Sequence, residues 1–108
     1  MIRIAIKQSA GIILDLHVSG HAQSGKSGHD LVCAGVSSVA TGILNACSIL
    51  AEDSCFLELQ DSPKAMIHIQ VKNQNDSSLQ IILKTAVIQM ETIKHRYTQY
   101  INITKQEV

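Results

Sequence analysis

Residues 30–51, DLVCAGVSSVATGILNACSILA, contain no charged residue after Asp30. Apolar side chains recur in this stretch every three or four residues, which is the spacing of one helix face. They are Val32, Val36, Val39, Ala40, Ile43, Leu44, Cys47 and Leu50. Asp30 can cap such a helix, because its carboxylate can accept hydrogen bonds from backbone amides two or three residues further on. The stretch predicts one long helix at the centre of the core.

The same stretch is long enough to suggest a membrane span. Small and polar residues interrupt it throughout, namely Gly35, Ser37, Ser38, Thr41, Gly42, Asn45 and Ser48. A helix covered on several sides by a sheet of its own domain has this composition. We therefore expect no membrane partner.

Strand patterns lie on both sides of this helix. Residues 2–7 and 12–18 are rich in isoleucine and leucine and flank a glycine-containing turn, which predicts a hairpin. Residues 55–60 and 65–72 flank Pro63, the only proline, and predict a second hairpin.

A second helix is predicted from Ser77, because apolar residues at helical spacing run from Leu79 to Tyr97. Ser77 and Gln80 have the spacing of a capping box. The order ββαββα indicates an α+β fold. We expect a single domain over residues 1–108, with an antiparallel-rich sheet packed around the central helix and a second long amphipathic helix. Two isoleucines off its main stripe, Ile81 and Ile88, are either a dimer contact or scattered surface residues.

Charge and cysteine content narrow the class of partner. Nine basic residues balance nine acidic ones, so no excess positive charge would attract free nucleic acid. The first residues lack a secretory signal. Three cysteines cannot all pair within one chain, and none of their spacings forms a CxxC unit. We therefore expect reduced thiols and a cytoplasmic protein. We expect no metal or cofactor.

The loop from Gly20 to Ser27 matches the phosphate-binding pattern G-x-x-x-x-G-K-[ST]. That mechanism needs a helix beginning at the Gly-Lys-Ser residues, so that its amides point at the phosphates. Here Gly28 follows at once, and a cap at Asp30 would bring a carboxylate close to the ligand. A nucleotide-binding module is therefore a weaker alternative. The glycines Gly20, Gly25 and Gly28 favour a flexible loop instead.

Cys33 lies near the start of the predicted helix, where unpaired amides and the helix dipole favour an anion. The alternative is a small buried cysteine on the apolar face of the helix. His21 lies at the mouth of the glycine-rich loop that leads back to this point. A histidine base beside a thiol nucleophile is the minimum for covalent acyl transfer. The pair by itself leaves both interpretations open.

Two sequence motifs resemble those of a known family and favour the catalytic interpretation of Cys33. Gly20-His21-Ala22 and Gly28-x-Asp30-x-Val32-Cys33-Ala34-Gly35-Val36-Ser37 resemble the signature of the ribosomal-processing cysteine protease family. The separation of histidine and cysteine and the order of elements are also similar to that family.

The resemblance implies a bacterial cytoplasmic endopeptidase, usually a homodimer. Such an enzyme removes an N-terminal extension from large-subunit ribosomal protein number twenty-seven. It implies that His21 is the base and Cys33 the nucleophile, with Asp30 and Ser37 as supporting residues near the site. His29 is a second histidine in the motif region, and we favour His21. A noncatalytic ribosome-assembly or peptide-binding factor is the main alternative function.

Overall fold

The chain folds in the order ββαββαβ, and the computed structural model describes residues 1–20, 29–61 and 65–108. Two short 3-10 helices, Glu52–Ser54 and Thr98–Tyr100, precede the third and fifth strands. The main elements are β1 (Ile2–Ser9), β2 (Ile12–Ser19), α1 (His29–Leu50), β3 (Cys55–Gln60), β4 (Met66–Val71), α2 (Ser77–Arg96) and β5 (Ile101–Glu107).

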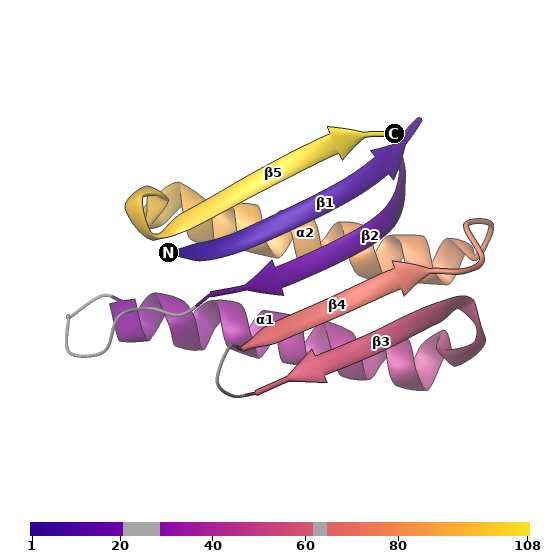
Figure 1. Cartoon of the computed structure of the whole chain (residues 1–108), viewed down its shortest axis with the longest axis horizontal. Helices are drawn as coiled ribbons and strands as arrows, with labels where there is room; N and C mark the ends of the chain where they lie inside the picture. The colour runs from indigo at the N-terminus through magenta and orange to yellow at the C-terminus, as the bar shows by residue number, and fades with distance from the viewer. Residues whose placement is uncertain (21–28, 62–64) are drawn as a thin grey trace.

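The five strands form one mixed sheet in the order β3-β4-β2-β1-β5 (Figure 1). Three pairings are antiparallel, and β1 pairs in parallel with β5 from Ile2 opposite Ile101 to Gln8 opposite Glu107. Both predicted hairpins are confirmed. The strand β5 is not among the elements predicted from the sequence, because only Ile101 and Ile103 are apolar in it and its second half is exposed and polar.

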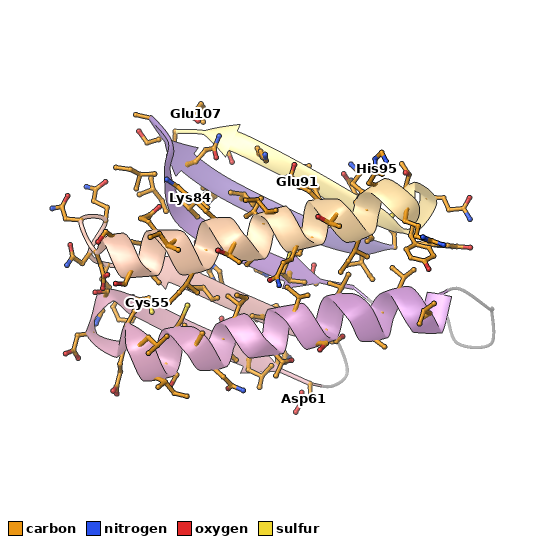
Figure 2. All side chains as sticks on the ribbon, turned by 180° about the vertical axis from the view of Figure 1, so that it is seen from behind. Cys55, Asp61, Lys84, Glu91, His95 and Glu107 are labelled. Atoms are coloured by element: carbon orange, nitrogen blue, oxygen red, sulfur yellow. The ribbon has the colours of Figure 1, made fainter. Side chains whose placement is uncertain are left out.

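Both helices cover the same face of the sheet (Figures 1 and 2). The isoleucines Ile2, Ile4 and Ile6 of β1 point into this layer, while the residues between them are exposed. The α+β class is confirmed. The first helix shares its face of the sheet with α2, so that the sheet does not surround it. The fully buried core joins β1, β2, β4, β5 and both helices through Ile4, Ile6, Leu16, Val32, Cys47, Ile69, Leu79, Leu83, Met90 and Ile101.

Helix α1 buries Val32, Val36, Ala40 and Cys47. Residues Leu31–Leu50 have a mean hydropathy of 1.6, and they are long and apolar enough to cross a membrane by composition alone. In the fold the helix packs against α2, β4 and β3. This packing explains the absence of charge on one side of α1. The other side exposes small and polar residues together with Leu31, Ile49 and Leu50, so the prediction that Leu50 lies on the buried face is wrong, because the packed part of the helix ends before it.

Gln80 connects α2 to β2 at a place where the sheet is irregular. The register between β1 and β2 shifts between Lys7 and Gln8, opposite the start of β2. The side chain of Gln80 accepts a hydrogen bond from the Ile13 amide and donates one to the Ile13 carbonyl, both at 2.8 Å. The predicted capping box is therefore wrong, because Gln80 is used in the core and Asp76 is the N-cap.

Replacing Gln80 with alanine is expected to lower the free energy of unfolding by about 2–4 kcal/mol, since two buried backbone groups lose their partners. Urea denaturation followed by circular dichroism measures this. Gln89→Ala is the matched control, because Gln89 lies exposed on the same helix. Equal effects of the two substitutions would show that the contact with Ile13 contributes nothing.

Asp76 caps α2 and also binds the preceding turn. Its carboxylate accepts a hydrogen bond from the Ser54 hydroxyl at 2.5 Å and from the Leu79 amide at 3.1 Å. The hydrogen bond from Ser54, and to a smaller extent the one from the Leu79 amide, lowers the pKa of the Asp76 carboxyl. A lowered pKa in the folded state stabilises the fold above the unfolded pKa, and this stabilisation is lost as the pH falls through the folded value.

The substitution Asp76→Asn is therefore expected to flatten the loss of stability on acidification below about pH 4, while keeping a residue that can cap a helix. Urea midpoints measured from neutral to acid pH test this. Asp53→Asn removes an exposed carboxylate that makes no cap hydrogen bond, and it should leave the acid dependence as it is. An unchanged pH profile for Asp76→Asn would contradict the assignment.

Candidate active site

Cys33 and Ser37 lie four residues apart on α1, and therefore on the same side of the helix. Both line a cleft between the N-terminal half of α1 and the adjacent ends of the strands. The sulfur-bearing side chain of Cys33 is half-buried, and Ser37 is exposed. Thr41 continues the same row one turn further on. The structure thus brings two of the predicted site residues to one opening.

The cleft has a volume of about 180 Å³. Its buried lining is apolar and comes from four elements: Ile2, Val18, Val36, Ala40 and Ile67. An apolar cavity of about 150 Å³ is large enough to bind benzene. The space beside Cys33 can therefore accept one large apolar side chain of a ligand.

Gly20 also lines the cleft, at the point where β2 ends. Its φ is +95°, and a Cβ atom at this position would collide with the backbone carbonyl of Met1. Only glycine fits both conditions. Residue 20 therefore lies close against the start of β1 where it lines the cleft.

Three other predicted residues lie outside the described residues: His21, Gly25 and Gly28. The backbone of Asp30 lies in α1.

The predicted start of the first helix differs from the structure by one residue. Helix α1 begins at His29, so Asp30 is its second residue and not its N-cap. Cys33 is the fifth residue, which lies just after the four amides that have no partner within a helix. Helix ends are set by local competition for these amides, and a pattern of apolar residues locates them only to within one or two residues.

The remaining lining residues were not among the predicted site residues. They come from the strands and their ends: Ser19, Leu59, Gln60, Asp61, Ala65 and Met66. Nothing in the sequence marks the five from 59 to 66, because they lie about thirty residues from Cys33 and reach it through the pairing of β3 and β4. The turn composition around Pro63 indicates a loop but not its position beside α1.

The topology argues against the phosphate-binding alternative. Strand β2, which precedes the loop, pairs antiparallel with both of its neighbours, β1 and β4. Phosphate-binding loops of the G-x-x-x-x-G-K-[ST] type follow a strand of a sheet built from βαβ units. Among the described residues, no three histidine, cysteine, aspartate or glutamate side chains could together hold a metal ion.

Cys47 and Cys55 are buried, and for Cys47 this agrees with its predicted place on the apolar face of the first helix. Desolvation by burial, and to a smaller extent the neighbouring Cys55, raises the pKa of the Cys47 thiol to about 12. Desolvation also raises the pKa of Cys55, whose thiol donates a hydrogen bond to the Ala51 carbonyl at 3.3 Å. Neither thiol is suited to act as a nucleophile near neutral pH.

Iodoacetamide at about pH 8 is therefore expected to alkylate Cys33 first in the folded protein, since the thiolate is the reactive form. Intact mass and peptide mapping would show one added carboxamidomethyl group, at Cys33. The same reagent in denaturant should modify all three cysteines and serves as the control. Early modification of Cys47 in the folded protein would contradict the burial found here.

Comparison with known proteins places this arrangement in a family. A family model described as cysteine protease Prp matches residues 1–102. The chain belongs to the Prp family. The ribosomal processing cysteine protease Prp of Staphylococcus aureus is 33% identical over 93 residues, which cover 86% of this chain and 87% of that protein. The Prp protein of Bacillus subtilis is 28% identical over 109 residues, or 96% of each chain.

Solved Prp structures have the same fold. An essential ribosomal processing protease Prp from S. aureus, in complex with a covalently linked product peptide, superposes with a TM-score of 0.83 at 32% identity, over 98% of this chain and 100% of that one. The S. aureus protease with a substrate peptide gives a TM-score of 0.84 at 30% identity and the same coverage. The resemblance in the sequence motifs is thus confirmed at the level of the family.

Proposed function

We propose that this protein is a cysteine endopeptidase that removes the N-terminal extension of large-subunit ribosomal protein number twenty-seven. The observation that carries the proposal is the position of Cys33, the half-buried cysteine that lines a cleft of about 180 Å³. The relatives from S. aureus and B. subtilis are ribosomal processing cysteine proteases, which supports the kind of substrate. The S. aureus structures with substrate and product peptides support a cleft that binds a peptide.

In the proposed reaction the Cys33 thiolate attacks the carbonyl carbon of the scissile peptide bond. His21 then protonates the leaving amine, which leaves a thioester on Cys33. Water, deprotonated by His21, attacks the thioester and releases the carboxylate product and the thiol. The chemistry needs no cofactor.

The negative charge on the tetrahedral intermediate requires hydrogen-bond donors. We assign this role to backbone amides of the first turn of α1, which begins at His29, because the first four amides of a helix have no partner within it. Asp30, three residues before Cys33, and Ser37, four residues after it, are proposed supporting residues. Ser37 lines the cleft.

The assembly proposed for the protein is a homodimer in the bacterial cytoplasm. Ile81 and Ile88 are 66% and 64% exposed and lie two turns apart on one face of α2. A second copy covering this face would remove both from water. Light scattering after gel filtration should give twice the mass of 11.7 kDa, and Ile81→Lys with Ile88→Lys should lower it to one chain.

The decisive test mixes the purified protein with the ribosomal protein that carries its N-terminal extension and follows the mass of that substrate. The proposal expects loss of one defined N-terminal peptide. A substrate mass that stays unchanged would favour a noncatalytic assembly or peptide-binding factor. The same substrate without its extension is the control, and it should keep its mass.

A further inference from the structure

One acidic side chain distinguishes the rim of the cleft. Fifteen residues line the cleft in the part of the chain that the structure describes, and Asp61 is the only one among them with a charged side chain. The other polar lining residues are neutral: Ser19, Ser37, Thr41 and Gln60. As far as the described lining goes, this one carboxylate gives the cleft a negative electrostatic potential.

Asp61 reaches the cleft because it directly follows the end of β3. Strand β3 ends at Gln60, and the exposed Asp61 is the next residue (Figure 2). Leu59, Gln60 and Asp61 all line the cleft although they are consecutive. Because neighbours in a strand point to opposite faces, a lining of consecutive residues means that the end of the strand itself borders the opening.

The Asp61 carboxylate is exposed at the rim of the cleft. None of the ion pairs formed within residues 1–20, 29–61 and 65–108 involves Asp61. A carboxylate at the rim of an apolar cleft is screened less by water than one on an open surface. It attracts an ammonium or guanidinium group and disfavours a carboxylate at the same position.

We propose that Asp61 is a specificity-determining residue that selects peptides with a lysine or arginine close to the apolar side chain held in the cleft. This inference rests on the proposed function, because it concerns the peptide bound beside Cys33. The apolar part of the cleft holds one large side chain, and Asp61 pairs with a cation that lies a few residues away along the extended peptide. Substrates with an acidic residue at that position are rejected by like charge.

Binding can be measured apart from cleavage with the full chain carrying Cys33→Ala. The probes are fluorescein-labelled ten-residue peptides of serine and alanine with one central phenylalanine. A lysine is placed in turn at each position on either side, and every lysine peptide has a glutamine and a glutamate counterpart. Fluorescence polarisation at low and high salt gives the dissociation constants.

At one or two positions the lysine peptide is expected to bind about fivefold tighter than its glutamine counterpart at low salt, with a smaller ratio at high salt. Asp61→Asn should remove this preference, and Asp61→Lys should invert it in favour of glutamate. Asp53→Lys is the matched control, because Asp53 is an exposed carboxylate just before the other end of β3 and does not line the cleft. It should keep the lysine preference.

The inference would be overturned if no position showed a lysine preference, and equally if no peptide bound at all. It would also be overturned if the lysine preference survived Asp61→Lys. Cleavage of the same peptides by protein with Cys33 intact tests the proposed function separately. Cleavage without a charge preference would overturn the role of Asp61 alone. A charge preference in binding without any cleavage would overturn the protease and support Asp61.

Discussion

Cys33→Ala protein is expected to lose peptide cleavage, with kcat reduced by about 10³-fold or more, because the covalent step has no nucleophile. The thermal unfolding midpoint should change little, since Cys33 is only half-buried and alanine is a good helix former. The assay follows the mass of the ribosomal substrate with time. Cys33→Ser is the closely matched variant, and it should be nearly as inactive, because a hydroxyl is a weaker nucleophile than a thiolate.

The histidine substitutions separate the two residues that could act as the base. His21→Ala should reduce kcat about as much as Cys33→Ala, because the effects of substitutions within one catalytic unit are not additive. The double variant should therefore be no slower than either single one. His29→Ala is the control and should retain most of the activity. A large loss with His29→Ala and a small one with His21→Ala would reverse the assignment of the base.

Gly20→Ala is expected to reduce both stability and activity. The backbone at residue 20 has a positive φ, and the added Cβ would collide with the Met1 carbonyl, which the start of β1 holds in place. The two effects together should cost about 2–4 kcal/mol of unfolding free energy. Because Gly20 lines the cleft, the shift needed to relieve the collision would also change its shape.

Gly11→Ala is the matched control for this experiment. Gly11 also has a positive φ, of +82°, but a Cβ there meets no atom within 4 Å. Its substitution should cost only the backbone strain, about 1 kcal/mol, and leave cleavage unchanged. Urea denaturation and the substrate mass assay measure both quantities. Equal losses at the two glycines would mean that the contact with Met1 is unimportant.

The local sequence pattern was enough to predict most of the helices and strands and part of the candidate site. The four strands before residue 72 and both long helices follow from short periodic segments, because the side of an element that faces the core is a property of neighbouring residues. The order of these elements implied the α+β class. The family motif around Cys33 identified the nucleophile proposed here, since those residues are close together in the chain.

Contacts between distant residues could not be predicted in the same way. Strand β5 is polar and exposed over most of its length, and it becomes a strand because β1 offers it an unpaired edge. Gln80 has the spacing of a capping residue, yet it binds Ile13 because a shift in register leaves that backbone facing α2. In both cases the competing partner lies more than sixty residues away.

The sequence by itself determined the four strands before residue 72, the two long helices and the family to which the chain belongs. The tertiary structure alone decided that Leu59, Gln60, Asp61 and Met66 meet the N-terminal half of α1, and hence that the cleft has an apolar floor with Asp61 at its rim. The physical reason is that periodicity along the chain records which side of an element is buried, whereas a cleft depends on which elements pack together.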